Sequence, residues 1–87
     1  MNIEYNEAKA KSNLKKHGVT FTEAETALYD PSALCQEDSS SKGESRWVLL
    51  GMSNKIRLLT VVYTVRSEHI RIISARRATR HESKYYA

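Results

Sequence analysis

Apolar residues alternate with polar ones in the second half of the chain, as they do in half-buried strands. Such runs extend over residues 46–52, 56–64 and 69–75. The segments between them are too short for parallel crossovers, which need about a dozen residues or more. We therefore predict an antiparallel meander, extended by a strand over 33–37, with a mobile loop over 38–43 and a short first strand at Ile3 and Tyr5.

The first half of the chain contains helix signals. Asn6 is suited to cap a helix over 7–17, whose first turn is acidic and whose last turn is basic, as the helix dipole favours. Gly18 can end that helix in a left-handed conformation. The few apolar residues in this segment predict a surface helix with a narrow buried stripe.

Two capping boxes predict further helices, because a threonine and a glutamate three residues later can bond reciprocally to backbone N–H groups. Thr20 and Glu23 predict a helix over 21–29, and Thr79 and Glu82 predict a short C-terminal helix. The side chains that we expect the second helix to bury are Phe21, Ala24, Ala27 and Leu28. The order of elements indicates an α+β fold, with a small antiparallel β-sheet, two N-terminal helices and a short C-terminal helix.

Size and composition are those of a small folded protein. Eighty-seven residues, 40% hydrophobic and 28% charged, indicate a single domain over 1–87. The single cysteine, Cys35, excludes an internal disulfide or a cysteine-based zinc site and suits a reducing compartment. The N-terminus lacks a signal-peptide pattern, and no apolar run is long enough to cross a bilayer, so we expect a cytoplasmic protein.

The net charge of +4 is unevenly distributed. Between Arg66 and Lys84 there are six basic residues and two acids, whereas the segment from Glu23 to Glu44 has six acids and one lysine. This asymmetry predicts a basic face for a polyanion and a separate acidic patch. The alternative is that solvated charges only keep a small protein soluble.

Arg76, Arg77 and Arg80 lie where the last strand meets the last helix. Guanidinium groups stay protonated and match phosphate oxygens, and at a helix N-terminus they oppose the dipole. We therefore predict a phosphate clamp at this junction. The alternative is that these are surface arginines whose stems cover apolar area.

Strand alternation does not show which face of the sheet is basic. In the last strand, strict alternation places Ile70, Ile72 and Ser74 on one face. It places His69, Arg71 and Ile73 on the other face. Because each face is mixed, the basic face stays unassigned.

His17 is the histidine best placed for proton transfer, since imidazole titrates near neutral pH. It can equally be a helix-ending residue that suits the dipole. His69, His81 and Glu68 are weaker candidates for the same role. The histidines lack the spacing of a metal site, so we expect no metal and no cofactor.

Several segments of the chain form recognisable motifs. They are Tyr5–Lys9, Asn13–Val19 with Phe21 and Glu23–Ala24, Asp30–Pro31, Gly43–Arg46, Gly51, Arg57–Thr64 with Arg66, and Ile70–Glu82. Together they resemble the BrnT family of toxins from type II toxin–antitoxin systems, and the run Ile-Ile-Ser-Ala-Arg-Arg-Ala is quite specific. Asn6, where the family usually has Asp, and the short tail after Tyr86 are small departures.

The resemblance implies a RelE-like fold and an endoribonuclease that cleaves RNA without a metal ion, and so inhibits translation and growth. It also implies a BrnA-like ribbon-helix-helix antitoxin as partner, with operator DNA bound only through the antitoxin complex, and no membrane contact. The catalytic candidates that it suggests are His17, Arg66, Arg76, Arg77 and Arg80. We add as RNA-binding candidates Lys15, Lys16, Arg57 and Arg71.

RNA supplies its own nucleophile, the 2′-hydroxyl, so the protein has to position a phosphate, stabilise developing charge and move protons. Arginine does not readily act as a base, which leaves that role to His17 or Glu68. Trp47 and Tyr63 can stack on bases or pack within the sheet. Two other functions fit the basic patch: a non-catalytic nucleic-acid-binding module, and a protein that docks an acidic partner.

Overall fold

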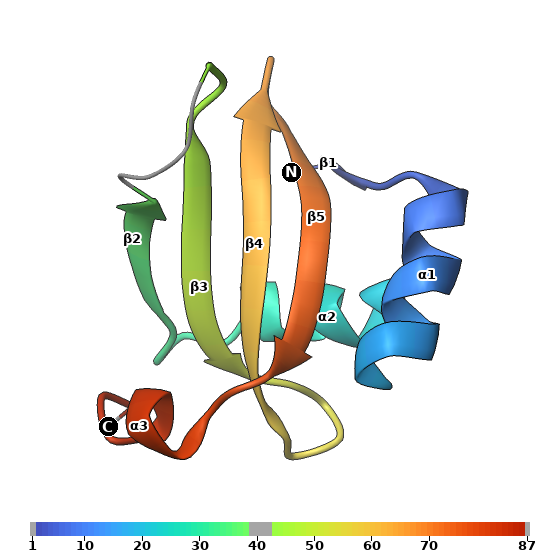
Figure 1. Ribbon diagram of the computed structural model, residues 1–87. Helices are drawn as coiled ribbons and strands as arrows, with labels where there is room; N and C mark the ends of the chain where they lie inside the picture. The colour runs from blue at the N-terminus through green and yellow to red at the C-terminus, as the bar shows by residue number, and fades with distance from the viewer. Residues whose placement is uncertain (1, 39–42, 87) are drawn as a thin grey trace.

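Residues 2–38 and 43–86, which the computed structural model describes, form a five-stranded sheet and three helices (Figure 1). The elements are β1 (Asn2–Glu4), α1 (Glu7–His17), α2 (Phe21–Leu28), β2 (Leu34–Asp38), β3 (Arg46–Met52), β4 (Leu58–Arg66), β5 (His69–Arg77) and α3 (Arg80–Ser83). The predicted α+β class is confirmed. Most of the loop predicted over 38–43 lies outside the described residues. The longest described helix has 11 residues, about half of what a bilayer span requires.

The strands lie in the order β1-β5-β4-β3-β2. The predicted meander is confirmed, because β2, β3, β4 and β5 pair successively as antiparallel neighbours. The first strand differs: β1 runs parallel to β5, with Ile3 opposite Ile70. β4 begins at Leu58 rather than at the predicted position 56, because Ile56 has a φ of 57° and belongs to the turn.

Local capping explains where the helices begin and end. Asn6 caps α1, and Gly18 ends it with a φ of 71°, both as predicted. Thr20 caps α2, but the box predicted there is wrong in its second half, because the Glu23 side chain turns into the protein instead of back to Thr20. The box formed by Thr79 and Glu82 at α3 is complete.

The core lies between the helices and one face of the sheet. Its buried members are Val19, Phe21, Ala24, Ala27, Leu59, Val61, Ile72 and Ala75, while Leu28 is only partly buried. α2 crosses behind the sheet and α1 lies beside β5 (Figure 1). Gly51 allows α2 to approach β3, since a Cβ at this position would lie 2.7 Å from the carbonyl oxygen of Ala27.

Asn13 attaches α1 to the free edge of β5. β1 pairs only with the start of β5, so the backbone of Ala75 has no strand on that side. Asn13 Nδ2 donates to the carbonyl oxygens of Ala75 at 2.7 Å and Val19 at 3.0 Å, and its Oδ1 accepts from the Ala75 N–H at 3.2 Å. The amide thus replaces a strand partner and fixes the C-terminal half of α1.

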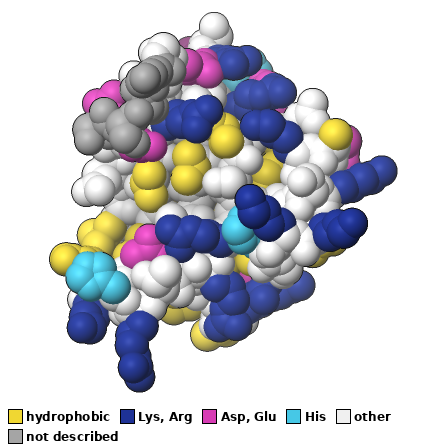
Figure 2. Space-filling model, viewed as in Figure 1, with side chains coloured by type: hydrophobic (Ala, Val, Ile, Leu, Met, Phe, Trp, Pro, Cys, Tyr) yellow, Lys and Arg dark blue, Asp and Glu magenta, His cyan; other side chains and the backbone are white. Residues whose placement is uncertain are grey.

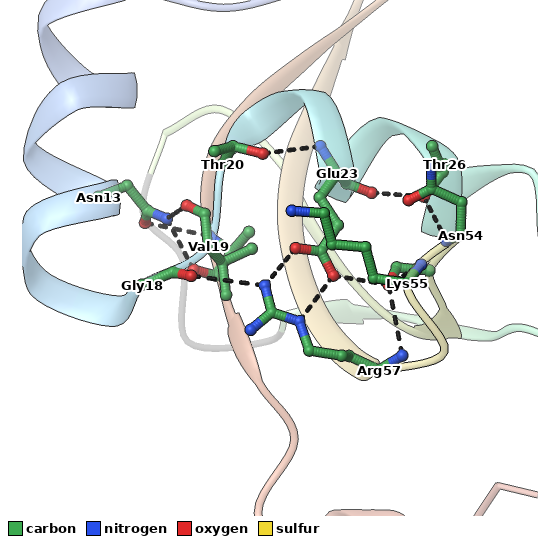
Figure 3. Close-up of polar contacts among 11 residues, drawn as sticks. Asn13, Gly18, Val19, Thr20, Glu23, Thr26, Asn54, Lys55 and Arg57 are labelled. Carbon is green, nitrogen blue, oxygen red and sulfur yellow. Dashed lines mark hydrogen bonds and ion pairs between the residues drawn. The ribbon is translucent and has the colours of Figure 1, made fainter.

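A buried ion pair joins α2 to the turn before β4 (Figure 3). The Glu23 side chain is only 1% exposed. Arg57 donates to it from Nε and Nη2, and Ser53 Oγ donates to Glu23 Oε2 at 2.6 Å. The hydrogen bond from Arg57 is the main reason why the pKa of Glu23 lies below its ordinary value, although burial acts in the opposite direction.

We expect Glu23→Gln to lower the free energy of unfolding by about 2 kcal/mol, because the charge-assisted bonds to Arg57 are lost. Glu25→Gln, a neighbouring substitution in the same helix, should stay near wild type. Urea unfolding at neutral pH measures both. Equal effects of the two substitutions would show that the ion pair does not stabilise the fold.

The same pair predicts a pH dependence. Because folding lowers the pKa of Glu23 from 4.5, its stabilising effect is complete above that pH and is lost as the pH falls through the folded pKa. The difference in unfolding free energy between wild type and Glu23→Gln should therefore narrow between about pH 5 and pH 3. Urea unfolding at several pH values in this range measures the difference. If the difference in unfolding free energy stays constant with pH, packing rather than the charge of Glu23 causes the destabilisation.

Candidate functional site

A β-bulge in β5 determines which of its side chains share a face of the sheet. The β4 partners of Ile72 and Ser74 are adjacent residues, so Ile73 is an extra residue in β5. The predicted strict alternation is therefore wrong beyond Ile72, and Ser74 does not share its face. After the bulge, Ala75 points into the core and Arg76 points away from it.

The face of the sheet opposite the core is covered by neither α1 nor α2 (Figure 1). The strand register places Arg66, Arg71 and Arg76 on this open face. Apolar side chains lie at its centre, with Lys and Arg side chains around them (Figure 2). The half-buried apolar residues that the register places on this face include Val48, Leu50, Met52, Leu58 and Val62.

A groove of about 480 Å³ lies at one end of the open face, between β2 and α3. Its lining residues are Leu34, Cys35, Gln36, Val48, Leu50, Thr60, Glu82 and Tyr85. Apolar side chains with a few polar groups among them are typical of a site for a small ligand.

Glu82 holds the guanidinium of Arg76 at the rim of this groove. Arg76 Nη1 and Nη2 donate to Oε1 and Oε2 of Glu82, each at 2.8 Å. Oε1 also accepts from Thr60 Oγ1 at 3.1 Å and from the Thr79 N–H at 2.8 Å. These bonds, that from Arg76 above all, lower the pKa of Glu82 to about 2, so the carboxylate is ionised at neutral pH.

Arg76 keeps donors that a ligand can use. A guanidinium has five N–H groups. Two point to Glu82, and a further one donates to the Arg77 carbonyl oxygen at 3.3 Å. Among the described residues, the Nε–H and one Nη2–H have no acceptor, and the side chain is 40% exposed. A phosphate oxygen can therefore bind without breaking the ion pair.

The clamp that the sequence predicted from three arginines does not form as expected. Arg77 follows Arg76 in β5, so its side chain points to the opposite face. Arg80 is exposed in the first turn of α3. Within residues 2–38 and 43–86, neither of these two arginines has a carboxylate partner. The structure thus leaves Arg76 alone of the three at the groove.

Arg66 and Arg71 lie further along the open face, each in a surface ion pair. Arg66 contacts Glu44 at 2.6 Å, and Arg71 contacts Glu4 at 2.7 Å. Arg66 is at the opposite end of the hairpin from Arg76, roughly 20–25 Å away along the strands. The two therefore cannot contact one phosphate.

His17 lies at the same end of the sheet as Arg76. It follows Asn13 by four residues and so shares its side of α1, which meets β5 at Ala75. Lys15 and Lys16 are exposed on the same last turn. Glu68 is in the distant β4–β5 turn.

Arg57 and Tyr63 have roles inside the fold. The guanidinium of Arg57 is bound to buried Glu23, so it holds the fold together and is not available to a ligand. Tyr63 faces the core side opposite Ile72, with its hydroxyl 3.0 Å from Cys35 Sγ, and burial raises its pKa. In the described part of the chain, no three His, Cys, Asp or Glu side chains gather into a metal-binding set.

Sequence reasoning missed the groove and the second role of Glu82. The groove combines Gln36, Thr60 and Tyr85 from segments far apart in the chain, and no local spacing indicates such a meeting. Glu82 was explained by the capping box, which it does form. The available signal was Arg76, which precedes the box by three residues and Glu82 by six.

The chain is similar to a known family over most of its length. The family described as "Ribonuclease toxin, BrnT, of type II toxin-antitoxin system" matches residues 5–82. A 1.1 Å crystal structure of the Brucella abortus ribonuclease toxin BrnT is similar with a TM-score of 0.70 and 30% identity, over 92% of this chain and 99% of that one. No curated protein sequence gives a significant match. The chain therefore belongs to the BrnT family of ribonuclease toxins of type II toxin–antitoxin systems.

Proposed function

We propose that this chain is an endoribonuclease that cleaves RNA without a metal ion and thereby inhibits translation and growth. The main observation behind the proposal is Arg76, which lies on an uncovered sheet face with two N–H groups available beside a groove. Family membership supports RNA as the target and an antitoxin as the partner. The net charge of +4 also favours a polyanionic ligand.

Arg76 would stabilise the charge that develops on the scissile phosphate while the neighbouring 2′-hydroxyl attacks. Glu82 would act as a positioning residue, because its two bonds fix the plane of the guanidinium. Arg71 and Arg66 would hold neighbouring phosphates along the open face. Their surface ion pairs contribute little to stability, so phosphate can displace the carboxylates.

His17 is the proposed proton-transfer group. Arginine does not release its proton, and the low pKa of Glu82 makes it a weak base. Glu68, the other candidate from the sequence, lies at the far end of the hairpin from Arg76. We also propose that Lys15 and Lys16, which flank His17, contact the RNA backbone.

The proposed partner is a BrnA-like antitoxin with a ribbon-helix-helix part, which neutralises the toxin. The complex of the two would bind operator DNA, with the DNA contacts made by the antitoxin. Support for this comes from the type II toxin–antitoxin description of the family.

Arg76→Gln should reduce RNA cleavage about 100-fold or more, because the phosphate loses its charged donor. Arg76→Lys keeps the charge but not the planar fork, and should recover only part of the activity. Lys9→Gln, a charge loss on the exposed side of α1, is the matched control. The assay is cleavage of single-stranded RNA in excess chelator, with thermal unfolding to show that each variant is folded.

Three results would contradict this proposal. Cleavage by folded Arg76→Gln at the wild-type rate would exclude Arg76 from the site. Loss of wild-type cleavage in chelator would exclude the metal-independent reaction. RNA that is bound but left uncut under all conditions would favour a non-catalytic binding module.

His17→Gln should lower kcat by about 100-fold or more with little change in KM, because a proton-transfer group acts in the chemical step. It should also remove a limb from the pH–rate profile. His69→Gln, at the other end of β5, is the control and should behave as wild type. If the profile of His17→Gln keeps its shape, another group transfers the proton.

A further inference from the structure

We propose that the groove between β2 and α3 is a nucleobase-binding subsite, which seats the base of the nucleotide whose 3′-phosphate Arg76 contacts. The inference rests on the proposed ribonuclease function and adds to it the position of the RNA base. Single-stranded RNA is commonly recognised through bases that leave the stack and enter such sites.

The shape and lining of the groove suit a flat heterocycle. Its volume of about 480 Å³ lies within the usual range for small-ligand sites. Leu34, Leu50 and Val48 provide an apolar surface from the neighbouring strands β2 and β3, with Leu34 directly opposite Leu50. Tyr85 provides an aromatic ring on the side of α3. A base can therefore pack between aliphatic side chains and a π-face.

The ring of Tyr85 is exposed but held in place. His81 packs against it in a T-shaped arrangement, with ring centroids 5.6 Å apart and an interplanar angle of 77°. The next residue, Tyr86, donates from its hydroxyl to Asp30 and ties the end of the chain to the segment after α2. Tyr85 is nevertheless 64% exposed, which leaves a large aromatic surface available for stacking.

Gln36 gives the groove a group that can distinguish one base from another. Its side-chain amide offers both donors and an acceptor, as the edge of a base does. Among the described residues this amide has no hydrogen-bond partner, and the residue is exposed. A bound base can therefore bond to it without displacing a protein contact.

Glu82 connects the groove with Arg76. Its carboxylate lines the groove and binds the guanidinium at 2.8 Å, so the cation lies at the rim. A base in the groove therefore brings its own phosphate to Arg76. This neighbouring cation favours a nucleotide over an uncharged apolar ligand.

The test is a titration of the full chain with each of the four ribonucleoside 3′-monophosphates, followed by backbone amide NMR. At least one should shift the signals of Leu34, Gln36 and Val48 in the groove, whereas inorganic phosphate should leave these three signals unchanged. Tyr85→Ala should weaken the binding about tenfold or more, and Tyr85→Phe should bind as wild type. Tyr29→Ala, an equally exposed tyrosine outside the groove, is the control.

Several outcomes would overturn the subsite. The first is an absence of groove shifts with all four nucleotides, and the second is unchanged nucleotide binding by folded Tyr85→Ala. The third is tighter binding of the matching 5′-monophosphate, which would place the base on the other side of the phosphate.

Cleavage assays separate the base subsite from the ribonuclease function. If Tyr85→Ala keeps the wild-type rate and base preference while Arg76→Gln is inactive, the subsite fails and the ribonuclease stands. If nucleotides bind the groove but no RNA is cut, the subsite stands and the ribonuclease fails.

Discussion

The ion pair between Arg76 and Glu82 is the contact on which the candidate site depends. It links the end of the sheet to α3, a helix of four residues that is too short to be stable alone. The same carboxylate completes the capping box and accepts from Thr60 in the neighbouring strand. One side chain therefore forms a wall of the groove and also orients the guanidinium at its rim.

The arginines of the chain fall into different classes once their partners are known. Arg57 is bound to a buried carboxylate, and breaking such a pair leaves an unpaired buried charge, so it belongs to the fold. Arg66 and Arg71 form exposed pairs that an RNA phosphate can replace. Arg76 is intermediate, because it keeps its bonds to the Glu82 carboxylate while two of its N–H groups stay available. The basic charge in the sequence thus has a structural use at Arg57, and in the proposed site it has a ligand-binding use.

A second constraint is that the two longer helices cover only one face of the sheet. Val48 and Leu50 consequently stay half-buried on the open face. Lys and Arg side chains surround the apolar side chains of this face (Figure 2). Exposed apolar surface surrounded by charge is characteristic of binding sites. RNA suits this arrangement, because its bases contact apolar and aromatic groups while its phosphates contact arginines.

Much of the backbone could be predicted from local chemistry. Asn6 and Gly18 set the ends of α1, Thr79 starts α3, and the short turns require an antiparallel meander. These features depend on residues within a few positions of one another, so sequence spacing is enough to detect them.

The candidate site could be predicted only in part, because its geometry depends on contacts between distant segments. The sequence identified Arg76 and His17 as candidates. It did not show the bulge at Ile73, which determines the face of Arg76. Nor did it show that Arg57 pairs with buried Glu23 and is therefore unavailable to a ligand. The groove appears only when β2, β3, β4 and α3 meet. Local spacing in the sequence determined the helices and strands of this protein. Only their packing decided which charged side chains lie together, because the position of a charge depends on strand register and burial.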